Sequence, residues 1–172
     1  LSHRTPWIIV YLLILCNPFS QYNPFPTRHL CATMALRCAM ETIFTKILKG
    51  EIPSVKLHED ELCFAILDIN PVNKGHLLLI TNEPYPDLQS CPDEVLAHLI
   101  RLAKLADAKL REHLHCDATN LVVNNGRESG QEVPHFHLHV IPRWKGDHKN
   151  IQLSKETYTD GQMAEYGKQL EF

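Results

Sequence analysis

Three histidines alternate with apolar residues in one short stretch of this chain, PHFHLHVIPR at residues 134–143. In a β-strand the side chains at i, i+2 and i+4 project from the same face of the sheet. His135, His137 and His139 are therefore predicted to form a row of imidazoles on a strand over 132–141, with the intervening apolar side chains in the core. Because neutral imidazole is a nucleophile, a proton carrier and a metal ligand near pH 7, this face is expected to be reactive.

Three interpretations of the histidine row are open. It could be a structural strand with solvated histidines, or a zinc site, since His-x-His on a strand suits zinc. Only Glu132 and no cysteine lies nearby to complete a zinc site. The third interpretation is nucleophilic catalysis on a phosphate, which the loop GRESGQ at 126–131 favours because its backbone N–H groups can turn toward an anion. Gln131 adds a neutral donor, and Asn124 ends the preceding strand.

The composition is that of one domain without an extended nucleic-acid surface. The chain has 172 residues and a formal net charge of −3. Residues 1–39 carry three arginines and no acidic residue, so residues 40–172 hold 14 basic and 20 acidic side chains. No basic block is present, which argues against nucleic acid as a partner. A small anionic ligand such as a nucleotide needs only local positive potential.

The first 39 residues differ from the rest. The apolar run at 7–16 is too short to span a bilayer and has the length of a signal-peptide core. No clear cleavage site follows it, and a compact, locally consistent sequence begins at Met40. We interpret residues 1–39 as translated upstream sequence or a wrongly assigned start, dispensable for catalysis, with a targeting segment as the alternative and a core element least favoured. The six cysteines form no disulfide framework, which favours the cytoplasm and no membrane partner.

Local patterns predict a mixed set of elements. Thr42 and Gly50 bound a short helix over 43–49. Ser90 is predicted as the N-cap of a helix over 93–114, with Asp93 at the acidic position of a capping box. Apolar residues recur at 3.6-residue spacing along this helix and are predicted to cover one face of a sheet: Val95, Leu96, Leu99, Leu102, Ala103, Ala106 and Leu110. Strands are predicted at 55–59 and 61–68 as a hairpin, at 76–80 and at 121–123. The polar tail offers three aromatic residues as possible anchors: Tyr158, Tyr166 and Phe172.

These elements predict an α+β fold with an antiparallel sheet of about five strands, one long helix and one short helix. We expect the domain to cover residues 40–144, followed by a C-terminal tail over 145–172. A single long helix covers only one sheet face. The other face should therefore hold a ligand, pair with another subunit, or both.

Several blocks of the chain resemble the histidine triad (HIT) superfamily. The histidine row resembles its His-x-His-x-His signature, and blocks resembling other family segments occur in order: TIFTKI at 42–47, GEIP at 50–53, ED at 59–60, LDINP at 67–71, GHLLLI at 75–80, VVNNG at 122–126 and GQEV at 130–133. The resemblance covers about residues 41–144. It points to the Hint-like branch and away from the galactose-1-phosphate uridylyltransferase branch, which has Gln at the third triad position.

The resemblance implies a nucleotidyl transfer to water. His137 would attack the α-phosphorus of a nucleoside phosphoester, anhydride or phosphoramidate and form a covalent intermediate. His139 would contact a phosphate oxygen and help to protonate the leaving group. His135 would hold the nucleophile in place, and His76 would support this network. The alternative is a nucleotide-binding or interaction protein in which hydrolysis is incidental.

The resemblance also implies how a nucleotide, with a purine base, would bind. Asp68 would accept the ribose hydroxyls, and the remaining nucleotide-binding residues would be Ile69, Asn124, Gln131 and Val133. It implies a homodimer with sheets joined across a two-fold axis, and no cofactor.

The chain departs from the family pattern at three places. Thr42 and Thr45 stand where many relatives have zinc-binding cysteines, so no such zinc is expected. The segment 80–84 lacks a histidine that the family often has. Glu132 stands where some members have Ser or Thr, and its carboxylate would repel a phosphate if it pointed inward.

Overall fold

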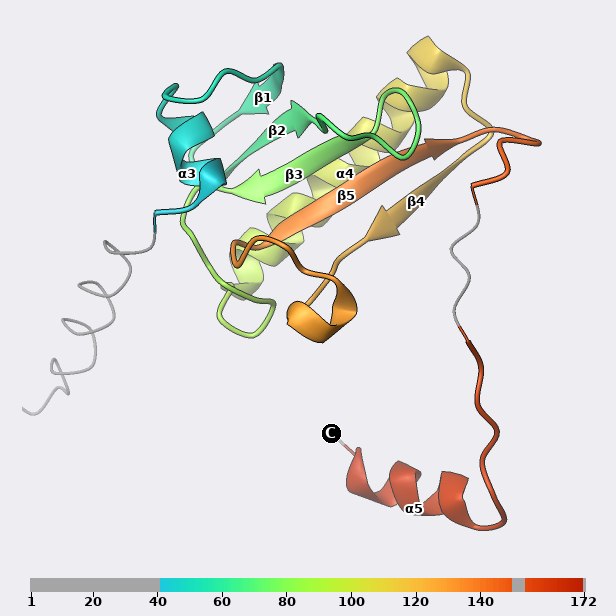
Figure 1. Cartoon of the computed structure of the whole chain (residues 1–172). Coiled ribbons are helices and arrows are strands. Elements are labelled where there is room, and N and C mark those ends of the chain that lie inside the picture. The colour runs from blue at the N-terminus through green and yellow to red at the C-terminus, as the bar shows by residue number, and fades with distance from the viewer. Residues whose placement is uncertain (1–40, 150–153, 172) are drawn as a thin grey trace, which may run out of the picture. The chain divides into compact units, whose positions relative to one another are not determined.

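The computed structural model describes residues 41–149 and 154–171, so the interpretation of residues 1–39 and the anchor Phe172 lie outside the described residues. The described elements follow in chain order (Figure 1): α3 Ile43–Leu48, β1 Lys56–Glu59, β2 Cys63–Leu67, β3 Leu77–Thr81, α4 Asp93–Leu114, β4 Ala118–Val122, the 3-10 turn Arg127–Ser129, β5 His137–Arg143 and α5 Gln162–Gln169. No helix in this part of the chain combines the length and the apolar character that a membrane crossing requires.

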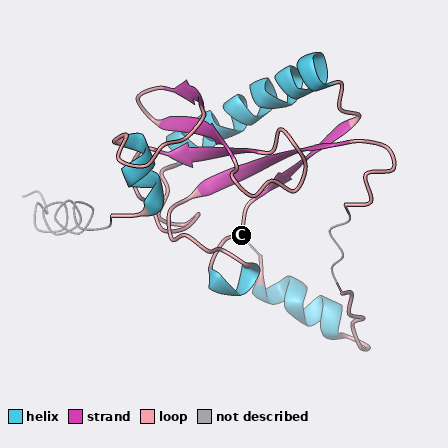
Figure 2. Ribbon diagram, turned by 45° about the horizontal axis from the view of Figure 1, so that its top comes forward, coloured by secondary structure: helices cyan, strands magenta, loops and turns pink. Residues whose placement is uncertain are grey.

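The strands form one antiparallel sheet in the order β1-β2-β3-β5-β4, which confirms the predicted α+β class. Helix α4 runs along one face of this sheet, behind β3 and β5 in Figure 1, and the turned view of Figure 2 shows the same layering. In the β3–β5 register, Leu78 lies opposite His139 and Ile80 lies opposite His137. The histidine strand therefore lies inside the sheet, not at its edge.

The face under α4 holds the larger core. The predicted apolar stripe of α4 is confirmed: Val95, Leu99, Ala103 and Leu110 are buried, and Leu96, Leu102 and Ala106 pack beside them. From β5, this core receives the apolar residues that alternate with the histidines, as predicted: Phe136, Leu138 and Val140. Burial of such side chains contributes roughly 1.5–3 kcal/mol each. The alternation therefore determines which way the histidines face.

The opposite face is covered only in part. A second core forms where Phe44 and Ile47 of α3 pack on Phe64, Leu78 and Ile80 of the sheet. Helix α3 has six residues and cannot cover the whole face. The uncovered part is where the side chains of His137 and His139 project.

The turn that connects β2 to β3 packs against the end of α4. Gly75 has φ +93°, and a Cβ there would lie 2.5 Å from Cδ1 of Leu114. Only glycine tolerates both the left-handed backbone and this close approach. The turn fixes the position of the neighbouring His76.

The start of α4 differs from the prediction. Pro92 takes the N-cap position, and no side chain caps the helix. Ser90 belongs to the preceding turn, where its N–H and its hydroxyl both donate to Asp87. The predicted capping box with Asp93 is therefore wrong, because the turn competes successfully for the serine.

The histidine strand also begins later than predicted, at His137 and not at residue 132. The N–H of His135 donates to the carbonyl of Val133 at 2.8 Å, so the chain turns just before the strand. Pro134, within this turn, has no N–H for a strand ladder.

Two further boundaries differ from prediction. Strand β4 begins at Ala118, earlier than the predicted 121–123. The tail contains α5, which was not predicted. Tyr158 and Tyr166 pack on each other with ring centroids 5.9 Å apart and are exposed, so neither is a buried anchor.

Candidate active site

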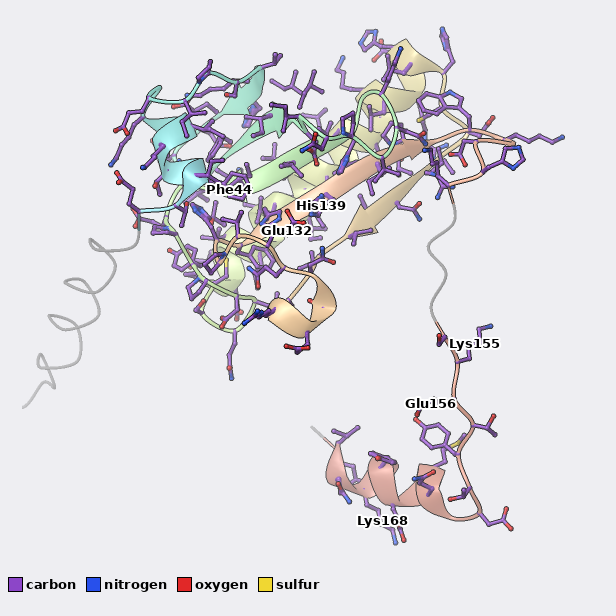
Figure 3. The ribbon with its side chains drawn as sticks, viewed as in Figure 1. Phe44, Glu132, His139, Lys155, Glu156 and Lys168 are labelled. Carbon is purple, nitrogen blue, oxygen red and sulfur yellow. The ribbon has the colours of Figure 1, made fainter. Side chains whose placement is uncertain are left out.

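The histidine row lies beside a phenylalanine of α3. The rings of His137 and His139 have centroids 4.9 Å apart. Phe44 makes edge-to-face contacts with His135 at 5.6 Å and with His137 at 5.0 Å between ring centroids. Figure 3 labels Phe44 on α3 and His139 on β5. The expected row therefore forms, with His135 just outside the strand.

His137 is held in one tautomer. It is 8 % exposed, and its Nδ1 lies 2.6 Å from the carbonyl oxygen of His135. A carbonyl oxygen only accepts, so Nδ1 carries the proton and Nε2 keeps its lone pair. Burial lowers the pKa of His137, although the bond to the His135 carbonyl and the charge of Asp68 oppose this shift. His137 is therefore neutral and nucleophilic near pH 7.

His135 is fully buried and hydrogen-bonded at both ring nitrogens. Its Nε2 lies 2.7 Å from the carbonyl of Thr81, and its Nδ1 lies 2.8 Å from the hydroxyl of Thr42. Nε2 must donate to the carbonyl, so Nδ1 accepts from the hydroxyl. Burial is the main cause that lowers the pKa of His135 to about 4. This fixed ring anchors the backbone whose carbonyl orients His137.

The two threonines of α3 are both engaged. Thr42 caps the helix and bonds to His135, and the Thr45 hydroxyl donates to the Thr42 carbonyl at 2.8 Å. The side chains of Thr42 and Thr45 offer hydroxyls, whereas zinc prefers thiolate and imidazole ligands. That no zinc binds at these positions stays a prediction.

His139 belongs to a chain of side chains that ends at a carboxylate. Its Nδ1 lies 3.0 Å from Nε2 of His76, a ring that is 3 % exposed. Nδ1 of His76 lies 3.3 Å from both the N–H of Val72 and Oδ2 of Asp68. Burial lowers the pKa of His76, and burial followed by the neighbouring histidines lowers the pKa of His139 to about 4.

These contacts support two proton arrangements. When Nδ1 of His76 accepts from Val72, its Nε2–H donates to His139, and Nε2 of His139 carries a proton. When Nδ1 of His76 is protonated toward Asp68, its Nε2 accepts from His139, and Nε2 of His139 is free to accept a proton. This series of hydrogen bonds therefore allows Nε2 of His139 either to donate or to accept a proton.

A cleft of about 1310 Å³ opens over the histidines. It is lined by most of the residues that the sequence singled out: Asp68, Ile69, His76, Asn124, Glu132, Val133, His137 and His139. The structure thus gathers side chains from four separate segments. Among the lining residues, Phe44, Ile47 and Arg143 were not predicted. In the sequence, the first two look like ordinary core residues of a short helix.

Gln131 is placed differently from the other predicted binding residues. Its amide accepts from the N–H of Gly126 and donates to the carbonyls of Pro86 and Val133. It lines a smaller neighbouring cavity of about 630 Å³ and not the histidine cleft. Its side chain holds the loop in shape, and its contact with a nucleotide stays a prediction.

Four of the six N–H groups in the loop at 126–131 are bonded inside the loop, so they do not support the predicted role of this loop in holding an anion. The N–H groups of Gly126, Ser129, Gly130 and Gln131 all bond within the loop. They are therefore committed to the turn and are not aimed at an anion. Glu132 is exposed and lines the cleft, and Figure 3 labels it beside His139. Its negative charge disfavours a phosphate at that position of the rim.

Comparison with known proteins identifies the family. Residues 49–146 match the family model of the HIT domain, so this chain belongs to the HIT family. It is 34% identical to an adenylylsulfatase of Arabidopsis thaliana over 79% of this chain and 76% of that protein. It is 40% identical to an adenosine 5′-monophosphoramidase of Saccharomyces cerevisiae over 65% of this chain and 66% of that protein.

The fold agrees with solved members of the family. A crystal structure of a HIT family protein from Bacillus anthracis superposes with a TM-score of 0.68 at 32% sequence identity. The match covers 74% of this chain and 93% of that one. The family predicted from the histidine row is therefore confirmed, and with it the open five-stranded sheet.

Proposed function

We propose that this protein is a nucleotide hydrolase that cleaves at the α-phosphate through a covalent nucleotidyl intermediate on His137. The substrates are nucleoside phosphoramidates or dinucleoside polyphosphates, and the product is a nucleoside monophosphate. One observation carries the proposal: the hydrogen bond from Nδ1 of His137 to the His135 carbonyl, which leaves Nε2 as a free nucleophile beside the cleft. The names of two relatives, an adenylylsulfatase and a monophosphoramidase, support it.

In the first step a bond forms between Nε2 of His137 and the α-phosphorus, and the bond from phosphorus to the leaving group breaks. The charged phosphate stabilises the protonated form of His139, and Nε2–H of that ring then passes its proton to the departing nitrogen or oxygen. The 4.9 Å between the two ring centroids lets both rings face one phosphoryl group.

In the second step water attacks the phosphorus and the Nε2–P bond breaks. His139 takes a proton from the water, and the nucleoside monophosphate leaves with the oxygen. His137 returns to its starting tautomer because its Nδ1 proton stays bonded to the His135 carbonyl throughout. Imidazole is a good leaving group from phosphorus once it is so oriented.

The nucleotide would lie along the cleft. Asp68, whose Oδ1 accepts the N–H of Asn70 at 2.8 Å, keeps lone pairs for the ribose hydroxyls. Ile69 is 91% exposed next to it and would cover a purine ring. Asn124 and Val133 would line the phosphate side.

The test is to mix the full chain with adenosine phosphoramidate and, separately, with a diadenosine polyphosphate, and to measure release of AMP. Multiple turnovers on either substrate support the enzyme, and their ratio ranks the two classes. Tight nucleotide binding without turnover on either would support the alternative, a nucleotide-binding protein with only incidental hydrolysis.

We also propose that the protein is a homodimer. Strand β4 is the last strand of the sheet and has no further strand beside it among the described residues, and Leu121 on it and Val123 just after it are 50% and 37% exposed. An apolar edge strand of this kind needs a cover to avoid uncontrolled pairing. Light scattering at micromolar concentration should give twice the mass of the chain, and a monomer would refute the proposal.

A further inference from the structure

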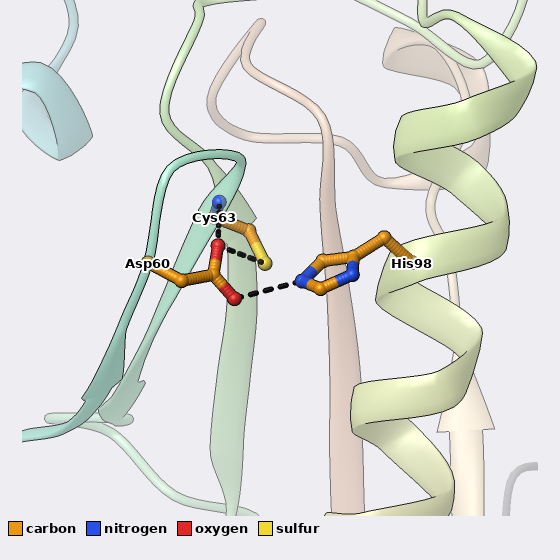
Figure 4. Close-up of side chains that lie close together, drawn as sticks. All are labelled: Asp60, Cys63 and His98. Atoms are coloured by element: carbon orange, nitrogen blue, oxygen red, sulfur yellow. Dashed lines mark hydrogen bonds and ion pairs between the residues drawn. The ribbon is translucent and has the colours of Figure 1, made fainter.

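A second cluster of metal-binding side chains lies where the β1–β2 turn meets α4, apart from the catalytic histidines. Figure 4 shows Asp60 of the turn, Cys63 at the start of β2 and His98 of α4. One ligand atom from each residue lies within 4.8 Å of the other two. The carboxylate Oδ2 is 2.7 Å from Nε2 of His98.

A second imidazole reaches the same oxygen. Nε2 of His58, on β1, lies 2.8 Å from Oδ2 of Asp60. The other carboxylate oxygen, Oδ1, accepts the N–H groups of Leu62 and Cys63 at 2.8 and 3.0 Å, which fixes the plane of the carboxylate. Two ring nitrogens and a thiol thus gather around an immobilised carboxylate.

We propose that His58, Asp60, Cys63 and His98 form a structural site for a divalent transition metal, with zinc as the preferred ion. Sulfur and imidazole ligands favour zinc and disfavour magnesium or calcium, which take oxygen ligands. With four protein ligands, no coordination position is left for a substrate, so the site is structural.

The geometry needs only a small expansion to hold the ion. In a tetrahedral zinc site with bonds of 2.0–2.1 Å to nitrogen and oxygen, the ligand atoms lie roughly 3.3 Å apart. The Nε2–Oδ2 distances of 2.7 and 2.8 Å would lengthen by about half an ångström as the ion replaces the shared protons. His58 and His98 are partly exposed, which gives the ion a path from solvent, while Cys63 is buried at the inner wall.

The ion would join parts of the chain that are distant in sequence. Asp60 and His98 are 38 positions apart. A metal that links them restricts the unfolded chain and ties the hairpin to α4, so binding should stabilise the fold.

The experiment uses the full chain, reduced and freed of metal with a chelator. Cobalt(II) is added as a spectroscopic probe, and zinc binding is measured by calorimetry and by the rise in melting temperature. We expect one cobalt ion with the visible absorption of a tetrahedral site and a thiolate-to-cobalt charge-transfer band. Cys63→Ser should remove that band, and His98→Gln should weaken zinc binding at least about 10-fold and abolish the rise in melting temperature.

Two matched variants assign the ion. His113→Gln changes an exposed histidine on the same helix and should bind zinc like the unaltered chain. Asp68, His76 and His139 form a second group that could hold the ion instead. His76→Gln removes one member of that group and should leave the zinc affinity unchanged. The proposal is overturned if His98→Gln binds zinc normally, if the charge-transfer band survives in Cys63→Ser, or if His76→Gln is the variant that loses the ion.

Discussion

Two histidine clusters among the described residues differ in how their rings are held. In the candidate catalytic cluster, each of His135 and His137 is buried and bonded to a backbone carbonyl, and burial lowers the pKa of both rings. In the cluster at the β1–β2 turn, His58 and His98 are partly exposed and share one carboxylate. The first arrangement keeps imidazoles neutral and oriented. The second holds them beside a negative charge, which suits a cation.

The largest effect is expected when the proposed nucleophile is removed. We expect His137→Ala to lower kcat by at least about 10³-fold, because the variant lacks the proposed nucleophile and the neighbouring imidazole, His139, is assigned to proton transfer. Binding of a nucleoside monophosphate should persist. Rapid quench and mass spectrometry should find the nucleotidyl adduct on His137 in the unaltered chain and none in the variant. An adduct on another residue would refute the assignment.

A smaller effect is expected at the sugar. Asp68→Asn keeps the size of the side chain and removes the charge, so KM for ribonucleotide substrates should rise about 10-fold, as for a lost charged hydrogen bond. The rise should be much smaller for 2′-deoxy substrates, which have one hydroxyl fewer. If the variant distinguishes ribose from deoxyribose as well as the unaltered chain, Asp68 does not bind the sugar. Its contact with His76 makes a lower kcat an additional expected result.

Stability should separate the two clusters further. His135→Ala leaves the buried Thr81 carbonyl without its ring partner, which costs about 1–3 kcal/mol. His98→Ala, measured without metal, removes a partly exposed contact between an imidazole and a carboxylate and should cost less than about 1 kcal/mol. Urea unfolding of both variants measures the difference. Equal losses would mean that the turn cluster is as tightly built as the catalytic one.

The last prediction concerns pH. His137 has a pKa below its ordinary 6.5, so more than half of it is neutral at pH 6.5 and kcat/KM should reach half its maximum only below that pH. His135 and His139 have pKa values of about 4 in the folded state, and the unfolded chain therefore binds protons first as the pH drops. Stability should fall between pH 6.5 and 4 by up to about 1.4 kcal/mol per pH unit for each histidine. A flat stability curve over that interval would contradict their burial in the neutral form.

Local sequence patterns predicted most of the elements. The period of two in residues 134–143 and the apolar stripe of α4 each follow from the geometry of a single strand or helix. Where the boundaries were wrong, a neighbouring interaction decided them. Ser90 satisfies a turn and not a helix, and the turn from Val133 to His135 delays the start of β5. Such competition is not visible in the pattern of apolar residues.

By itself, the sequence determined the order of the elements, the side of β5 on which the histidines lie and the family to which the chain belongs. Only the tertiary structure decided the partners of those histidines: Thr42 and Thr81 for His135, and His76 for His139. It also brought together Asp60, Cys63 and His98, which have no ligand spacing in the sequence. The reason is that periodicity reports the direction of a side chain along one element, whereas a contact depends on how separate elements pack.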